Sequence, residues 1–376
     1  MKNYGCTSIH EFLGDLIVYR NLVPLDSRLP DLETVRKQID LPTGLIPRKT
    51  TPAYADFISA LLPQARALAT PHATIQQLIY LGDTRMNDGT AFTNICRSGG
   101  WRGFAFIAAE REDPNSAEVI EQENGVLYLA DHWGELFAFD EFLHEQSFPV
   151  DESTTVIIDL DKTALGARGR NDKVIDLARV EAVRSTVDNL LGDSYDPTEF
   201  KAAYDCLNQP KYHPFTTDNQ DYLAYTCLIL SAGLIELDTL TDKLKMDPRI
   251  TFQQFMLEVN GRTEELPGHL LRIHNEVYGY VQEGDPTPFK TFRHNEYIAT
   301  VERMGNLDDH ASVSEILQDE IVITQELREI VLAWQEEGDL LFGLSDKPGE
   351  ASIPTDDLKA KGYRAIHQVD THSIGG

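Results

Sequence analysis

Apolar runs that stop at a polar residue occur at three places in the chain and predict buried strands. Residues 156–158 form a continuous β-branched run, which is typical of a strand covered on both faces, and Asp159 stands where that strand ends. Residues 78–81 form a second apolar run, and residues 340–344 form a third that leads into Ser345. Because ligands bind at the carboxyl ends of parallel strands, we expect these three ends to lie at one edge of a sheet.

A helical pattern occupies the middle of the chain. Apolar residues recur at helical spacing between Val174 and Val183, and the segments 222–237 and 316–334 each read as one apolar helix. Elsewhere the pattern predicts helices at 54–67 and 355–361 and strands at 125–130 and 363–369. The predicted division of the chain is an α/β part at 1–168, a helical insert at 169–334 and a second α/β part at 335–376.

Composition narrows the choice of partners. A chain of 376 residues with 41% hydrophobic residues is long enough for two domains with substantial cores. Its formal net charge of −28 repels nucleic acid and anionic membranes, so we expect neither as a partner. The sequence has no run of apolar residues long enough to span a membrane and no secretory signal pattern, which predicts a cytoplasmic protein.

Cysteine and histidine give no zinc pattern along the sequence. The chain has four cysteines without CxxC spacing and without a pairing with a nearby histidine that would suggest zinc, which is ordinary intracellular usage. His367 and His372 near the C-terminus could suggest a metal, but a strand with incidental histidines is the interpretation that we favour. Disulfides are not implied.

The end of the first strand carries the most informative chemistry. Asp159 and Asp161 are separated by one residue, so both could point oxygen atoms at one cation, and Mg²⁺ prefers such hard ligands. The alternative is a strand-to-helix turn in which Asp161 or Thr163 only caps a helix.

Three other segments supply further parts of a phosphate site. Asp83 and Asp88 follow the apolar run 78–81 and form a second acidic strand end. Lys49 stands just before the predicted helix 54–67, and the hydroxyl of Ser345 follows the third strand. Together these segments predict a site that handles a phosphoryl group and Mg²⁺.

These segments resemble the motifs of the haloacid dehalogenase superfamily. The family carries hhhhDxDxT as motif I, a strand-ending Ser or Thr as motif II, a Lys as motif III and GDxxxD or GDxxxxD as motif IV. In this chain the matching residues are Asp159, Asp161 and Thr163 for motif I, Ser345 for motif II, Lys49 for motif III, and Asp83 and Asp88 for motif IV. The motifs run III, IV, I, II along the sequence, which is a rotation of the family's order.

A circular permutation explains this rotation. The resemblance implies a three-layer α/β/α Rossmann-like core with a parallel sheet, opened between the strand of motif II and the Lys segment, with residues 111–153 joining the old ends. Permutation is tolerated where chain termini lie near each other, so we expect the two termini to be neighbours. The helical insert falls between motifs I and II, where family members carry a C1-type cap over the active site.

The resemblance also implies roles for individual residues. Asp159 would be the nucleophile that forms an aspartyl-phosphate, and Asp161 would act as the general acid and base. Thr163, Ser345 and Lys49 would hold the phosphoryl oxygens. The expected ligands of Mg²⁺ are Asp159, Asp161 through its carbonyl, Asp83 and, in support, Asp88.

Basic residues near the motifs are candidates for substrate contact. Arg168 and Arg170 lie in a glycine-bearing turn after motif I and could clamp an anionic group, or the turn could be only a solvated hinge. Lys347 lies beside Ser345 and could contact substrate or fill the basic role in place of Lys49.

The expected function is a Mg²⁺-dependent phosphatase that acts on a small phosphorylated metabolite. Two alternatives stay open: a slow or silent relative that binds a partner through its helical insert, and a phosphotransferase in which a second hydroxyl replaces water. The insert could close over its own site or pair with another copy of the chain in a homo-oligomer. No residue of the insert indicates which metabolite is bound.

Overall fold

The computed structural model describes residues 1–112, 116–192, 196–217 and 219–376. The chain forms two compact units, one made of Met1–Leu177 with Thr300–Gly376 and the other of Ala178–Ala299. The helical unit is therefore shorter than the predicted insert at 169–334. Residues 300–334 belong to the first unit because they contain a strand that pairs within it, as described below. No helix of the described residues is long and apolar enough to cross a membrane.

A seven-stranded sheet forms the centre of the first unit. Its strands lie in the order β2-β9-β7-β3-β4-β6-β5, and all neighbours are parallel except β5 and β6. The strand bounds are Ile17–Val18 for β2, Leu340–Leu344 for β9, Thr154–Asp159 for β7, Gln77–Gly82 for β3, Arg102–Ala108 for β4, Gly125–Ala130 for β6 and Ala117–Gln122 for β5. Every residue of β7 is buried, as its β-branched run predicts. The α/β class expected from the sequence is confirmed.

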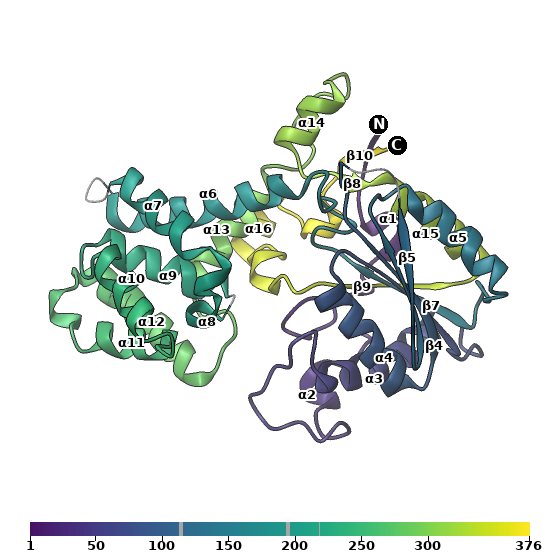
Figure 1. The fold of residues 1–376 in the computed structure, drawn as a ribbon, viewed down its shortest axis with the longest axis horizontal. Helices are drawn as coiled ribbons and strands as arrows, with labels where there is room; N and C mark the ends of the chain where they lie inside the picture. Colours follow the sequence, from purple (N-terminus) through teal and green to yellow (C-terminus); the bar gives the residue numbers. More distant parts are fainter. Residues whose placement is uncertain (113–115, 193–195, 218) are drawn as a thin grey trace. The chain divides into compact units, whose positions relative to one another are not determined.

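Helices cover both faces of this sheet, so the unit has three layers (Figure 1). On one face, α3 (Pro52–Ala69) and α4 (Thr90–Gly99) pack their apolar side chains on Tyr80 and on Ile157. On the other face, α5 (Glu135–Glu145) places Phe139 5.5 Å from the ring of Phe106 in β4. Helix α15 (Gln325–Glu337) contacts α5 on this side. The shorter helices of the unit are α1 (His10–Leu13), α2 (Leu32–Val35), α14 (Val313–Asp319) and α16 (Asp356–Ala360).

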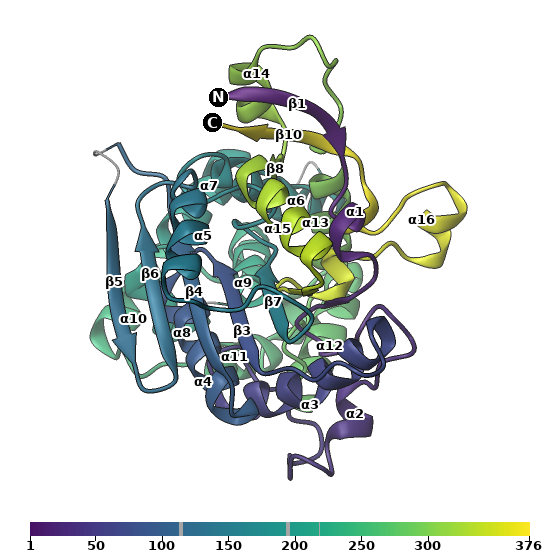
Figure 2. The same cartoon turned by 90° about the vertical axis from the view of Figure 1, so that its right-hand side faces the viewer.

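A second sheet joins the two ends of the chain. Strand β1 (Lys2–Thr7) is antiparallel to β10 (Thr371–Gly375), with Lys2 opposite Gly375, and the short β8 (Ile323–Thr324) is parallel to β10. Figure 2 shows the two ends side by side. The prediction that the termini are neighbours is confirmed.

Two predicted elements are wrong. Residues 363–369 do not form a strand, because a 3-10 turn lies at Ile366–Gln368. Residues 316–334 are not one helix, because the β-branched residues around β8 pair as a strand between α14 and α15.

The second unit contains only helices among its described elements. After α6 (Asp172–Leu191), which begins in the first unit, come α7 (Pro197–Leu207), α8 (His213–Thr216), α9 (Gln220–Ser231), α10 (Leu237–Met246), α11 (Phe252–Asn260), α12 (Gly268–Glu283) and α13 (Lys290–Val301). The helix expected at 222–237 ends at Ser231, because Gly233 has a positive φ of 71°.

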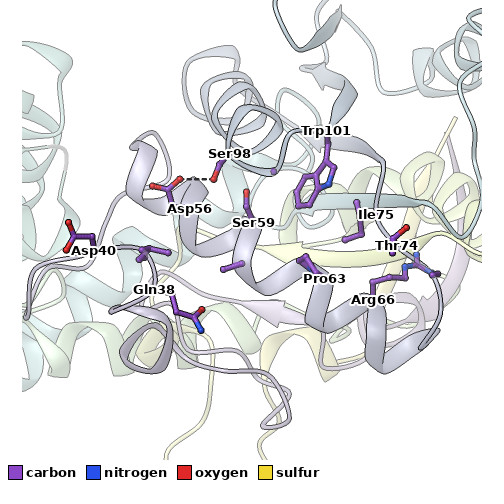
Figure 3. A pocket seen from close by; sticks show the side chains of 14 residues that line it. Gln38, Asp40, Asp56, Ser59, Pro63, Arg66, Thr74, Ile75, Ser98 and Trp101 are labelled. Atoms are coloured by element: carbon purple, nitrogen blue, oxygen red, sulfur yellow. Dashed lines mark hydrogen bonds between the residues drawn. The ribbon is translucent and has the colours of Figure 1, made fainter.

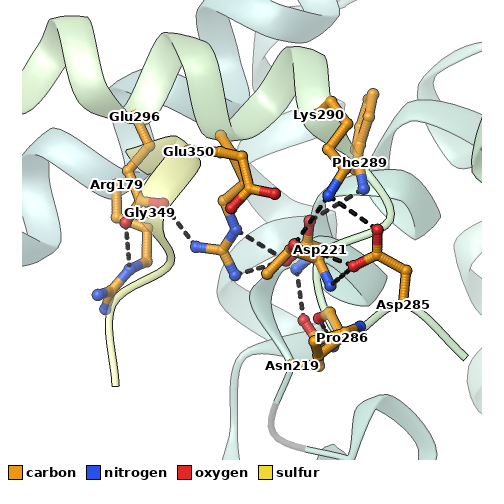
Figure 4. Close-up of polar contacts among 12 residues, drawn as sticks. Arg179, Asn219, Asp221, Asp285, Pro286, Phe289, Lys290, Glu296, Gly349 and Glu350 are labelled. Carbon is orange, nitrogen blue, oxygen red and sulfur yellow. Dashed lines mark hydrogen bonds and ion pairs between the residues drawn. The ribbon is translucent and has the colours of Figure 1, made fainter. Parts of the chain in front are cut away.

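A buried ion pair fixes the interior of this unit. The guanidinium of Arg293 donates to Asp221 Oδ2, with Nε at 2.8 Å, and Nη1 donates to Glu296 Oε2 at 2.5 Å. Figure 4 shows Asp221 also accepting from the backbone N–H of Phe289, at 3.0 Å. Because Arg293 is buried and its charge is matched by carboxylates, it is a packing residue of the helical unit.

Candidate active site

The carboxyl ends of β9, β7 and β3 lie at one edge of the sheet, as the three apolar runs predict. Asp159 is the last residue of β7 and pairs in register with Leu344, so Ser345 emerges beside it. On the other side of β7, Leu81 pairs with Ile158, which places Asp83 at the same edge. The motif residues on these three strands are thus brought together by parallel pairing.

Three carboxylates converge at this edge. Asp83, Asp88 and Asp159 each have one oxygen that lies within 4.8 Å of the others. Asp88 reaches the cluster because the chain forms a π-helical turn, Arg85–Gly89, directly after β3. A Cβ at Gly82 would lie 2.5 Å from the Cβ of Asp88, so this turn requires glycine there.

Lys49 bridges two of these carboxylates. Its Nζ lies 2.5 Å from Asp159 Oδ1 and 2.6 Å from Asp88 Oδ1, and its side chain is 3% exposed. The lysine ends a loop that leads into α3, where Thr51 caps the helix by accepting from the N–H of Tyr54. Although burial opposes its charge, Asp159 and Asp88 raise the pKa of Lys49 well above its usual value. The lysine is therefore held as a cation inside the acidic cluster.

Lys347 has other contacts. Its Nζ donates to Thr300 Oγ1 at 3.1 Å, and its backbone N–H donates to Ser345 Oγ at 3.0 Å. Lys49 is thus the lysine that contacts Asp159, while Lys347 contacts Ser345 and Thr300.

The turn after β7 holds the carboxylate of Asp159. Thr163 donates its hydroxyl to Asp159 Oδ2 at 2.8 Å, while the N–H of Ala164 donates to the carbonyl of Asp159 at 3.2 Å. Lys162 adopts a positive φ of 67° to close the turn. The described residues between the end of β7 and Asp172 contain no helix, so the alternative in which Asp161 or Thr163 only caps a helix is wrong. Asp161 lies in this turn and is half-buried.

The environment separates the pKa values of the three acids. Burial raises the pKa of Asp83 to about 9, with the charges of Asp159 and Asp88 adding to the effect and Arg168 opposing it. Burial likewise raises the pKa of Asp159 to about 7 in spite of Lys49. Burial opposes ionisation of Asp88 too, but Lys49 and the N–H of Thr84 lower its pKa to about 2. Burial is thus the largest cause of the raised pKa values of Asp83 and Asp159, while Lys49 keeps Asp88 ionised.

Arg168 and Arg170, which follow Thr163 in the chain, make contacts with different carboxylates. Arg168 Nε lies 2.5 Å from Asp83 Oδ2, and about a third of its side chain is exposed, so it faces the acidic cluster. Arg170 is buried and donates to both oxygens of Glu326 at 2.9 Å and to Glu110 at 3.1 Å. The two arginines therefore do not form a clamp in the structure. Arg170 instead pairs with Glu326 and so connects the turn to α15.

The acidic cluster fits a hard divalent cation. Asp83, Asp88 and Asp159 offer carboxylate oxygens, which are the ligands that Mg²⁺ prefers. Burial raises the pKa values of Asp83 and Asp159, and a divalent cation beside them would favour their ionised forms. The carboxylate of Asp161 is not part of this cluster.

Two residues that position Asp88 were not expected from the sequence. Tyr80 donates its hydroxyl to Asp88 Oδ1 at 3.2 Å, and Thr84 donates both its N–H, at 2.8 Å, and its hydroxyl, at 3.0 Å, to Oδ2. The signal for Tyr80 was a tyrosine inside a fully apolar run, because a buried phenol needs a hydrogen-bond partner.

A cavity of about 790 Å³ lies elsewhere, along the outer side of α3 (Figure 3). Its lining includes Ser59 and Pro63 of α3 together with Trp101, and Ser98 there donates to Asp56 at 2.7 Å. None of the site residues expected from the sequence lines it. The candidate site expected from the sequence is therefore separate from this cavity.

Comparisons of this chain with family models, with curated proteins and with solved structures find no match. Function therefore has to be inferred from the geometry of the site and from the order of the motifs along the chain.

Proposed function

We propose that this protein is a Mg²⁺-dependent phosphatase of the haloacid dehalogenase type, acting on a small phosphorylated metabolite. The observation that carries the proposal is the convergence of Asp83, Asp88 and Asp159 around Lys49 at the carboxyl edge of a parallel sheet. This set of groups can bind a metal and a phosphoryl group at one nucleophilic carboxylate.

The strand order supports the family. The strand of motif I, β7, lies between the strand of motif II, β9, and the strand of motif IV, β3. The pairing of β1 with β10 supports the permutation, because a short turn between Gly376 and Met1 would convert these two strands into a hairpin. Opening the chain near residue 123 would then restore the order I, II, III, IV.

Asp159 is the proposed nucleophile. One of its oxygens forms a bond to phosphorus while the bond from phosphorus to the ester oxygen breaks, and Asp161 gives its proton to the leaving oxygen. A water molecule then loses a proton to Asp161 and attacks phosphorus, which releases phosphate and restores Asp159. Lys49 and Thr163 already contact the two oxygens of Asp159 and thereby fix its orientation.

Asp83, Asp88 and Asp159, with the carbonyl of Asp161, are the proposed ligands of Mg²⁺. When bound, the cation would offset the repulsion between an anionic carboxylate and an anionic phosphate. Ser345 and Lys49 would then hold phosphoryl oxygens, and Arg168 would contact either Asp83 or the substrate.

The helical unit is the proposed cap. It is inserted in the chain between β7 and β8, hence between motifs I and II. A cap at this position would exclude water during the first step and contact the leaving group.

The test is phosphate release from a panel of small phosphomonoesters, with Mg²⁺ or with EDTA. Wild type is expected to turn over a subset of esters only with Mg²⁺, and Asp159→Asn is expected to lose activity by about a thousandfold or more. Asp56→Asn, on α3 and outside the cluster, is the matched control and is expected to retain activity. Equal turnover by wild type and Asp159→Asn, or no turnover of any ester by wild type, would contradict the proposal.

A further inference from the structure

A second cluster of metal-ligating side chains lies at the sheet that joins the two ends of the chain. Cys6 of β1 and His372 of β10 stand opposite each other in the antiparallel register. Asp309, in the segment before α14, completes the group: one ligating atom of each of the three residues lies within 4.8 Å of the others. The sequence separates Cys6 from the other two by more than 300 positions, so no spacing pattern could indicate this cluster.

His372 is held in the orientation of a metal ligand. It is fully buried, and its Nδ1 lies 2.7 Å from Oε2 of the buried Glu320, whose other oxygen accepts from the N–H of Leu307. The Nδ1–H tautomer that donates to Glu320 leaves the Nε2 lone pair directed at the cluster. Pairing of this kind between a carboxylate and a histidine is typical of metal-binding histidines.

The Nε2 atom of His372 has no hydrogen-bond partner among the described residues. Asp309 Oδ1 lies 3.3 Å away, a contact that is an ion pair when the ring is protonated. In the neutral Nδ1–H tautomer, Nε2 and this oxygen are two acceptors that face each other, and a cation between them would satisfy both.

The spacing of the atoms fits zinc. A tetrahedral Zn²⁺ ion with ordinary bond lengths separates nitrogen and oxygen ligands by about 3.3 Å and sulfur and oxygen ligands by about 3.6 Å. Two of the three separations are 3.3 Å from His372 Nε2 to Asp309 Oδ1 and 3.5 Å from Cys6 Sγ, whose thiol donates to the same oxygen, while Sγ and Nε2 lie within 4.8 Å of each other. The local backbone supports this placement: the ladder is irregular between Asn3 and Cys6, and the Asn3 side chain donates to the carbonyl of Asp309 at 3.2 Å.

We propose that Cys6, Asp309 and His372 bind one Zn²⁺ ion, with Glu320 as the partner that orients His372. A thiolate and an imidazole favour zinc over Mg²⁺, which keeps this site chemically distinct from the carboxylate cluster around Asp159. The side chain of Asp309 is 71% exposed, so the fourth position is open to water. Bound zinc would tie β1, β10 and the segment before α14 together and thereby fasten the first strand of the chain to the last.

Cobalt provides a readout that only a thiolate site gives. Full-length protein, freed of metal with a chelator, is titrated with Co²⁺ and then with Zn²⁺ in excess Mg²⁺, which occupies hard carboxylate sites. Wild type is expected to bind one ion per chain, to show thiolate-to-cobalt charge-transfer absorption and to melt at a higher temperature with Zn²⁺.

Three variants separate this site from other zinc binding. Cys6→Ser is expected to lose the cobalt absorption and to weaken zinc binding more than about a hundredfold. Glu320→Gln, which keeps an acceptor for the N–H of Leu307, is expected to weaken zinc binding about tenfold to a hundredfold. Cys206→Ser, in the helical unit, is the control and is expected to match wild type. Absence of the cobalt absorption in wild type, or equal zinc affinity in wild type and Cys6→Ser, would overturn the proposal.

Discussion

Lys49 Nζ lies 2.5 Å from Asp159 Oδ1, although the two residues are 110 positions apart in the chain. The contact forms because the loop before α3 and the end of β7 meet at the carboxyl edge of the sheet. Lys49 also lies 2.6 Å from Asp88 Oδ1, so one buried cation is shared by the two carboxylates. This relationship makes the charge balance of the site directly testable.

Replacing Lys49 with Met is expected to lower phosphatase activity about a hundredfold or more, because the site loses a cation that contacts the nucleophile. It is also expected to lower the free energy of unfolding by about 3 kcal/mol, since Asp88 and Asp159 stay buried without their partner. Kinetics and urea denaturation measure the two effects. Lys347→Met, which removes a contact to Thr300 instead, is the comparison. A larger loss of activity in Lys347→Met than in Lys49→Met would refute this assignment.

Arg168 and Arg170 are expected to behave differently when shortened. Arg170→Met leaves the buried Glu326 without its partner and is expected to destabilise the fold by about 3 kcal/mol. Arg168→Met removes a half-exposed contact to Asp83 and is expected to change activity and Mg²⁺ dependence with little loss of stability. Thermal denaturation alongside steady-state kinetics distinguishes the two. Equal destabilisation by both substitutions would show that this division of roles is wrong.

Gly82→Ala is expected to impair the site through sterics alone. The added Cβ would lie 2.5 Å from the Cβ of Asp88, so the π-helical turn must shift. We expect a destabilisation of about 1–3 kcal/mol and a loss of activity, measured by denaturation and by phosphate release. Gly134→Ala, at a position where a Cβ meets no atom within 4 Å, is the matched control. Unchanged activity in Gly82→Ala would mean that the position of Asp88 does not matter.

Asp339 predicts a pH dependence of stability that is independent of the active site. Its carboxylate is buried without a hydrogen-bond partner among the described residues, and burial raises its pKa to about 8 although Arg66 opposes the shift. Between its unfolded pKa near 4 and about 8, the folded state keeps a proton that the unfolded state loses, so this group's contribution to stability falls as pH rises.

Asp339→Asn removes this titration. Urea denaturation at pH 5, 7 and 9 is expected to show the variant gaining stability over wild type as pH rises. The exposed Asp356→Asn should show a difference from wild type that changes little with pH. A constant difference between Asp339→Asn and wild type across this range would mean that Asp339 does not titrate as described.

Re-linking the chain tests the permutation. A variant that joins Gly376 to Met1 through a short turn and opens the chain between Glu123 and Asn124, in the turn between β5 and β6, would carry the motifs in the order I, II, III, IV. Because β1 and β10 are already paired at these ends, we expect it to fold and to keep activity. Circular dichroism and phosphate release provide the readout, and a failure to fold would argue against the permuted architecture.

Local sequence patterns were sufficient to predict the buried strand that ends at Asp159. The β-branched run before Asp159 predicts a fully buried strand because only such a strand tolerates apolar residues on both faces. The same logic failed at residues 363–369, which form a 3-10 turn at Ile366–Gln368 and no strand. Tertiary packing overrides the local pattern there, and a local window of sequence does not contain that packing.

The candidate site likewise contains residues that local patterns predict and contacts that they do not. Asp83, Asp88 and Asp159 could be predicted because each follows a recognisable strand, and parallel strands bring their ends together. The buried pairing of Arg170 with Glu326 and the facing of Cys6 with His372 could not, because each depends on contacts between segments remote in sequence.

The most direct test of the central claim is a search for a phosphoryl group on Asp159. Protein is incubated with Mg²⁺ and the best ester of the panel, quenched in acid, digested and analysed by mass spectrometry. The account predicts a peptide that contains Asp159 and carries one acid-stable, hydroxylamine-sensitive phosphoryl group, present in wild type and absent without Mg²⁺. Turnover with that peptide unmodified in a rapid-quench time course, or a phosphoryl group on a different residue, would contradict it.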